Sequence, residues 1–266
     1  MPIFSVNSWE SFERKVSRIR TDEALAGRKT EFLFRGITDS TFPLATTLER
    51  AGWDGTPIYE YYRVVDRAKS EIETFTNEKW ELPDWPEVQK ELCVYDTWSL
   101  RRFPDRATHS YMVRLRHHGF PSPLLDWSRS LYIAAYFAFR SATKPKQGKV
   151  SVYMFSEQPT NFKSSGGGHP QIRRIGPYVT THRRHFLQQS DYTMCATFNS
   201  EWCFAKHSDI FNLDGKDQDV LWKIDIPWKE RSKVLKTLDT YTLNAFSLFG
   251  SEESLMEKIA LREFGT

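Results

Sequence analysis

The sequence predicts an α+β fold: a single domain with a small split or mixed β-sheet core flanked by helices. Three observations carry this prediction. The chain has 266 residues and is 39% hydrophobic, which is enough to bury a substantial core. Amphipathic stretches of helical period are interspersed with short runs rich in β-branched and aromatic residues. No repeat or domain-scale linker divides the chain, so we expect one unit over residues 1–266.

The N-terminal part is expected to contain helix, strand and helix in that order. Residues 1–30 form a helical lead-in, because apolar positions recur at helical spacing over 9–20. Residues 31–36 (EFLFRG) are mostly apolar and are followed by turn-forming residues, which predicts a buried strand that ends at Gly36. Apolar positions at intervals of three and four predict a long helix over 58–75.

The central part is expected to be helical. After two prolines, a further helix is expected over 87–100. Residues 108–117 place apolar side chains on one face and are followed by a glycine, where a helix can end. The charge-free run 131–139 (LYIAAYFAF) has the length of a fully buried helix, with Ser128 or Ser130 as its N-cap. We expect this helix to lie at the centre of the core.

The C-terminal half is expected to supply most of the sheet. Three segments are rich in β-branched and aromatic residues, which predicts strands over residues 149–155, 192–198 and 220–226. Three consecutive glycines predict a flexible loop over 160–175. Helices are expected to close the chain at 229–238 and 252–262.

Composition excludes several classes of protein. The net charge of +3, from 37 basic and 34 acidic residues, is too small for nucleic-acid binding by bulk charge, although it leaves a local basic face open. Three cysteines without CxxC spacing argue against a disulfide framework and a cysteine-based zinc site, so no metal is expected. The polar N-terminus and the lack of a long apolar run argue against secretion and membrane insertion, so we expect a cytoplasmic protein.

The segment 116–128 (RHHGFPSPLLDWS) is the densest source of chemistry. It brings two imidazoles, a carboxylate, a hydroxyl and an indole into a turn between two predicted helices. The structural alternative is a rigid, proline-locked connection in which Asp126 caps the following helix. Either arrangement places polar side chains beside the predicted core helix.

Two motifs resemble the FRG domain family. These are FLFRG at 32–36 and RHHGFPSPLLDWSRSLYIAAYFAF at 116–139, which match its pattern of an FRG strand, a His-Gly-Pro-Leu-Leu-Asp-Trp segment and an alanine- and phenylalanine-rich helix. Weaker matches extend the resemblance from about residue 30 to residue 262.

A more distant resemblance is to ADP-ribosyltransferases of the arginine-serine-glutamate type, which implies an ADP-ribosyltransferase-like fold and NAD as a substrate. In those enzymes one strand ends in Arg-Gly, a later strand carries a hydroxyl-rich turn before a helix, and a final strand supplies a glutamate. Arg35 and Gly36 would take the first position, residues 125–128 the second, and Gln188 or Gln189 the third.

This resemblance implies a role for each residue. Arg35 would pair with a cofactor phosphate, and Gly36 would allow close approach. Asp126 and Ser128 would shape the ribose pocket, while Trp127 would stack on nicotinamide. The catalytic candidates are Arg35, His118, Asp126 and Gln189. The cofactor-binding candidates are Arg35, Gly36, His117, Leu125, Asp126, Trp127 and Ser128.

One departure leaves the chemistry open. A glutamine cannot supply the charge of the transferase glutamate, so another acid (Asp126, Glu201 or Glu252) would have to reach the cleft. A second hypothesis is therefore a non-catalytic nucleotide-binding or partner-binding module. A third is metal-free hydrolysis or nuclease activity by His117, His118 and Asp126.

The partners follow from the same resemblance. Stand-alone FRG proteins are similar to toxin-like and phage-defence effectors, which implies an intracellular RNA, DNA or protein target and an antitoxin partner. An electropositive stretch would be the place for a phosphate backbone to dock, and it contains Arg173, Arg174, Arg183 and Arg184.

Overall fold

The computed structural model describes residues 1–25, 31–94, 102–157, 170–181, 183–210 and 219–265. Its strands are β1 (Ile3–Ser5), β2 (Phe32–Ile37), β3 (Leu125–Ser128), β4 (Lys149–Ser156), β5 (Gln171–Arg174), β6 (Ser190–Phe198), β7 (Trp202–Phe204) and β8 (Val220–Pro227). They form one eight-stranded mixed sheet in the order β1-β8-β4-β2-β3-β6-β5, with β7 paired to β6. The predicted α+β class is confirmed.

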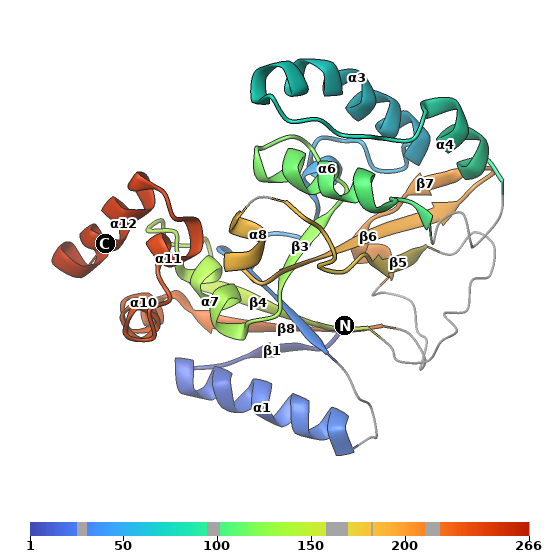
Figure 1. Ribbon diagram of the computed structural model, residues 1–266. Coiled ribbons are helices and arrows are strands. Elements are labelled where there is room, and N and C mark those ends of the chain that lie inside the picture. Colours follow the sequence, from blue (N-terminus) through green and yellow to red (C-terminus); the bar gives the residue numbers. More distant parts are fainter. Residues whose placement is uncertain (26–30, 95–101, 158–169, 182, 211–218, 266) are drawn as a thin grey trace.

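The helices cover both ends of this sheet (Figure 1). They are α1 (Trp9–Leu25), α2 (Thr47–Arg50), α3 (Ile58–Thr76), α4 (Trp85–Leu92), α6 (Arg106–His117), α7 (Leu131–Phe139), α8 (Arg183–Leu187), α9 (His207–Ile210), α10 (Arg231–Thr240), α11 (Ala245–Phe249) and α12 (Glu252–Phe264), with a 3₁₀ turn at Trp228–Glu230. The six helices expected over 9–20, 58–75, 108–117, 131–139, 229–238 and 252–262 are all present. Within the described ranges, none is both long and apolar enough to cross a membrane.

The sheet divides into two wings between β2 and β3. β2 pairs with β4 along its whole length, from Phe32 opposite Ser156 to Ile37 opposite Ser151. Within the described strands, β2 meets β3 only where Phe34 lies opposite Ser128. β3 instead pairs with β6 over all four of its residues. The two strands therefore separate after Phe34, although they belong to one mixed sheet.

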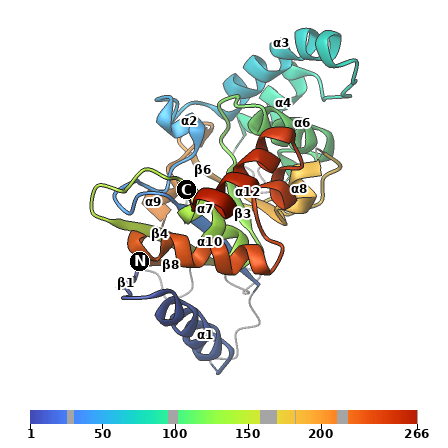
Figure 2. The same cartoon turned by 90° about the vertical axis from the view of Figure 1, so that its left-hand side faces the viewer.

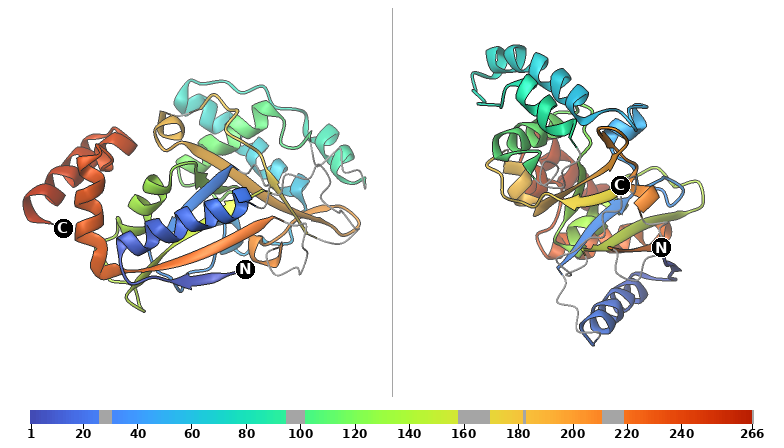
Figure 3. Two further views of the ribbon diagram at one scale, coloured as in Figure 1. Left: turned by 90° about the horizontal axis from the view of Figure 1, so that it is seen from below. Right: turned by 90° about the vertical axis from the view of Figure 1, so that its right-hand side faces the viewer.

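Each wing buries its own core. In Figure 1, α3, α4 and α6 gather over the wing of β6 and β7, whereas α1, α7, α10, α11 and α12 lie around the wing of β4 and β8. Figure 2 shows α10 and α12 beside α7, and the view from below in Figure 3 shows α1 lying across the strands. Phe34 and Met154 belong to the α7 core, and Tyr192 and Met194 belong to the α6 core. A third cluster includes Leu125 and packs on another sheet face.

Helix α7 is the central core helix, as predicted. Ser130 rather than Ser128 is its N-cap, since its hydroxyl accepts a hydrogen bond from the Ile133 backbone N–H. Gly36 on β2 lies directly against α7. A Cβ atom at residue 36 would be 1.9 Å from the Ala134 carbonyl oxygen and 2.5 Å from the Ala138 nitrogen. Only glycine allows this strand and this helix to approach so closely.

Four predictions about the elements need correction. Residues 125–128 form strand β3 rather than part of a turn, so Asp126 does not cap α7. The lead-in over 1–30 contains strand β1 as well as α1. The helix expected over 87–100 ends at Leu92, and 95–101 lie outside the described residues. Of the loop expected over 160–175, residues 171–174 form strand β5, while 160–169 lie outside the described residues.

Candidate functional site

A cavity of about 230 Å³ lies where β2 and β3 separate. Its walls come from β2, β3, the end of α6, one face of α7 and the entry to β6. The lining residues are Phe34, Arg35, Gly36, His117, Asp126, Trp127, Ser128, Ala134, Phe137, Gln188 and Ser190. Residues more than 150 positions apart thus meet at one point, which we call the split cavity.

Arg35 is the cation of the split cavity. Its side chain is 16% exposed, and its Nη1 donates a 2.6 Å hydrogen bond to the Asp126 backbone carbonyl. The same nitrogen is 3.8 Å from Asp126 Oδ2. No described residue accepts a hydrogen bond from the buried Nε. Burial lowers the pKa of the Arg35 guanidinium to about 10, which leaves it charged at neutral pH.

The Asp126 carboxylate is held by a different arginine. Arg116 on α6 donates from Nε to Oδ1 at 2.6 Å and from Nη2 to Oδ2 at 2.5 Å, a bidentate pair. Its Nη1 also donates to the Thr47 hydroxyl at 2.9 Å. Burial raises the pKa of Asp126, but the Arg116 guanidinium more than offsets this and holds the pKa below its usual value. One carboxylate thus faces two guanidinium groups, and the cluster keeps an excess positive charge.

His117 is oriented by a hydrogen-bond relay through Tyr192. His185 Nε2 lies 3.2 Å from the Pro177 carbonyl, which can only accept, so this nitrogen carries a proton. In neutral His185 the other nitrogen, Nδ1, accepts from the Tyr192 hydroxyl at 3.1 Å. The phenol oxygen then accepts from His117 Nε2, also at 3.1 Å. Burial lowers the pKa of His185, which favours the neutral form. The relay therefore sets which nitrogen of His117 carries its proton.

The structure brings most of the predicted site residues together. Arg35, Gly36, His117, Asp126, Trp127 and Ser128 all line the split cavity. The Ser128 hydroxyl donates to the Gln188 carbonyl at 2.8 Å and also accepts from the Ser130 N–H, which ties β3 to the entry of β6. The backbone of α7 fills the space next to Gly36, so this glycine serves the contact between strand and helix.

Other predicted residues lie elsewhere. His118, the C-cap of α6, is exposed and is not among the residues that line the cavity. Gln189 is also exposed, and Gln188 takes its place in the lining. The Leu125 side chain is fully buried in another core cluster. The Trp127 indole belongs to that same cluster, where it contacts Phe155 and donates to the Thr193 hydroxyl at 2.8 Å.

The alternative acids do not reach the split cavity. Glu201 lies between β6 and β7 beside Cys93, and Glu252 is an exposed residue in the first turn of α12. Of the described residues that line the cavity, Asp126 is the only carboxylate. No cluster of three or more His, Cys, Asp or Glu side chains suited to a metal ion occurs within the described ranges.

The four arginines proposed as a phosphate dock lie on two different elements, β5 and α8. Arg174 is bound by the buried Asp191 at 2.7 Å and by Glu31 at 2.8 Å. Arg173 precedes it on β5 and donates to the Phe103 carbonyl. Arg183 and Arg184 belong to α8, where Arg184 lies over the Phe249 ring.

Sequence reasoning missed three contributors: Arg116, Tyr192 and Phe137. Arg116 opens the segment 116–128 that was singled out, in the last turn of α6, and its presence there was the available signal. Tyr192 and Phe137 carried no such signal, because both have the character of core residues.

Comparison with known proteins finds a match to part of the chain. No curated protein and no solved structure matches it. The model of the FRG domain matches residues 30–147, which include Arg35, Arg116 and Asp126 but not the later segments expected to extend the resemblance to residue 262. The matched region covers less than half of the chain and runs from just before β2 to the loop before β4.

Proposed function

We propose that the chain is an ADP-ribosyltransferase-like protein that binds NAD at the split cavity and transfers ADP-ribose to a protein or nucleic-acid acceptor. One observation carries the proposal: a charged, largely buried arginine lies at the split of a mixed sheet with a buried Nε for which no described residue is an acceptor. Buried polar groups normally have partners, so such an atom suits an incoming anion.

The cluster chemistry supports an anionic ligand. Arg35 and Arg116 share the single Asp126 carboxylate, so a phosphate oxygen near Arg35 would offset the remaining positive charge. A guanidinium binds phosphate through two parallel hydrogen bonds, a geometry that lysine lacks. The Asp126 backbone carbonyl accepts a hydrogen bond from Arg35 Nη1 and thereby orients the Arg35 guanidinium before a ligand binds.

The volume of the cavity limits what enters it. At about 230 Å³, it is smaller than the roughly 300–1,000 Å³ of sites that enclose whole drug-sized ligands. It suits one end of a dinucleotide, such as nicotinamide with its ribose. His117 and Ser128 would supply polar contacts there, and Phe34 and Phe137 would supply apolar walls.

A specific observation favours the second candidate, a nucleotide-binding module without turnover. Both Asp126 oxygens already accept hydrogen bonds from Arg116 at 2.5–2.6 Å. The carboxylate is therefore less able to stabilise the positive charge that develops on the ribose when nicotinamide leaves. In this candidate the same cavity binds NAD, and no bond is broken.

Incubation with labelled NAD separates the two candidates. A transferase releases nicotinamide and leaves acid-stable label in the protein or nucleic-acid fraction of a cell extract, which also identifies the acceptor class. Arg35→Met should abolish both signals, whereas Arg18→Met, on the exposed face of α1, should retain them. Thermal stabilisation by NAD without release of nicotinamide would support the binding module. The absence of both stabilisation and turnover in the wild-type protein would refute the proposal.

A further inference from the structure

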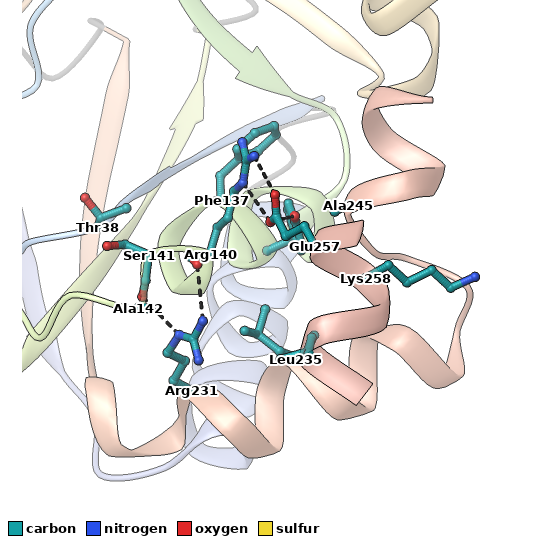
Figure 4. Close-up of a pocket in the computed structure, with 12 residues that line it drawn as sticks. Thr38, Phe137, Arg140, Ser141, Ala142, Arg231, Leu235, Ala245, Glu257 and Lys258 are labelled. Atoms are coloured by element: carbon teal, nitrogen blue, oxygen red, sulfur yellow. Dashed lines mark hydrogen bonds and ion pairs between the residues drawn. The ribbon is translucent and has the colours of Figure 1, made fainter. Parts of the chain in front are cut away.

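A second, larger cavity of about 600 Å³ lies between α7 and the C-terminal helices (Figure 4). It is lined by Thr38, Tyr136, Phe137, Arg140, Ser141, Ala142, Arg231, Leu235, Ala245, Glu257, Lys258 and Leu261. Its volume falls within the range typical of ligand sites. We call it the helical cavity.

The polar groups of the helical cavity are held in place. Glu257 accepts from Arg140 Nε and Nη2 at 2.9 and 2.7 Å, and from the Tyr136 hydroxyl at 2.8 Å. Arg231 Nε donates to the carbonyls of Phe139 and Ser141 at the end of α7, at 3.0 and 2.9 Å. Figure 4 shows the bonds of Glu257 and Arg231 to the other lining residues. Such fixed groups lose little conformational freedom when a ligand binds.

The lining combines positive charge with apolar walls. Two guanidinium groups (Arg140 and Arg231) and one carboxylate, Glu257, give it an excess of one positive charge, whereas Lys258 points away from the cavity (Figure 4) and its ammonium lies over the Phe246 ring. The apolar walls include Phe137, Leu235, Ala245 and Leu261. This combination suits a ligand that is both anionic and largely apolar in its body, as a nucleotide with its aromatic base is.

The split cavity and the helical cavity lie next to each other along β2 and α7. On β2, residues 34–36 line the split cavity, and Thr38 lines the helical cavity just beyond the strand. On α7, Ala134 lines the first, and Arg140 lines the second at the helix C-cap. Phe137 lines both. The Phe249 ring packs against Phe137 at 5.9 Å and lies beneath the Arg140 guanidinium at 4.4 Å.

We infer that the split and helical cavities are the two ends of one dinucleotide-binding cleft, with Phe137 as the shared wall between them. This inference rests on the proposed function and names the site of the second nucleotide. The split cavity takes the nicotinamide end beside Arg35. The pyrophosphate begins at Arg35, crosses Phe137 and passes near Arg140, and the adenosine end enters the helical cavity against Leu235 and Ala245.

A matched pair of variants tests the inference. Ala142 is exposed and lines the helical cavity, so Ala142→Trp narrows this cavity without disturbing the core. Thr143→Trp adds the same ring at the next exposed position, which is not among the lining residues. Titration calorimetry on the full chain compares NAD with nicotinamide mononucleotide, which lacks the adenosine end.

The expected result is specific to one variant and one ligand. Ala142→Trp should weaken NAD binding at least tenfold and change nicotinamide mononucleotide binding less than twofold, whereas Thr143→Trp should change neither. Unchanged NAD affinity in Ala142→Trp would overturn the inference and leave the proposed function standing. Equal losses for both ligands would also overturn it, because the helical cavity would then not be specific to the adenosine end. If the wild-type protein binds neither ligand, the proposed function fails and the inference fails with it.

Discussion

Replacement of Gly36 by alanine tests whether this glycine serves the fold or the ligand. The added Cβ would meet the Ala134 carbonyl oxygen at 1.9 Å and the Ala138 nitrogen at 2.5 Å, both backbone atoms of α7. Neither atom can rotate away, so α7 or β2 must shift by more than 1 Å. Overpacking of a core typically costs about 1–3 kcal/mol, and a backbone clash belongs at the upper end. A loss of ~3 kcal/mol lowers the Tm of a chain of this size by about 6–12 °C.

Differential scanning fluorimetry and urea unfolding measure this loss. Gly52→Ala is the control, because Gly52 has a φ of +78° but open space around its Cβ position. It should lose only about 1 kcal/mol from backbone strain. If Gly36→Ala melts within 2 °C of the wild type, the steric argument is refuted. Retained stability with loss of NAD binding would instead assign Gly36 to the ligand.

Three further variants test the interactions around the split cavity. Arg116→Met removes the bidentate partner of Asp126, and urea unfolding should show a loss of about 3 kcal/mol, with a smaller loss for Arg116→Lys. Tyr192→Phe should lose about 1–3 kcal/mol, and imidazole ¹⁵N chemical shifts should show that His117 no longer keeps a single tautomer. Burial lowers the pKa of His109 to about 3, so the unfolded chain binds a proton near pH 6.5 that the folded chain does not. The free energy of unfolding should therefore fall as the pH drops, by about 2 kcal/mol between pH 7 and pH 5. His109→Leu should remove this part of the loss. An identical pH profile for the variant would contradict the assignment of the loss to His109.

The sequence predicted the elements whose signals are local. Helix α3 shows the helical period along 19 residues, and α7 is a charge-free run with a serine cap at its start. Strands β3 and β5 lacked such signals. β3 has four residues after a proline-rich segment, and β5 has the sequence QIRR. Both form because β6, which lies many residues further along the chain, supplies their hydrogen-bond partners. Such non-local pairing leaves little trace in a short window of sequence.

The sequence predicted only part of the candidate site, because the site too depends on contacts between residues far apart in the chain. The family resemblance placed Arg35 and Asp126 together, and the structure shows them in one cavity. It assigned His118 to catalysis and His117 to cofactor binding, but adjacent helical residues point about 100° apart, and His117 is the one that lines the cavity. His117 turns toward Tyr192, and His118 turns toward solvent.

Burial and pairing determine where the Trp127 and Arg174 side chains lie. Strand alternation sends the Trp127 indole to the opposite side of β3 from Ser128, where Phe155 and Thr193 surround it. Arg174 neutralises the buried Asp191, so its charge serves the fold. Neither partner is adjacent in sequence, and therefore neither pairing was visible before the sheet register was known.

The most direct test of the central claim is titration of NAD into the wild-type protein and into Arg35→Met. Arg35 is buried without a short carboxylate contact of its own, so the variant should keep or raise the Tm. Loss of a charge-assisted hydrogen bond, roughly 1.5–3 kcal/mol, should weaken NAD binding about 10- to 100-fold. Equal NAD affinity in the two proteins, or an Arg35→Met protein that unfolds, would contradict the assignment of Arg35 as the anion anchor of the split cavity.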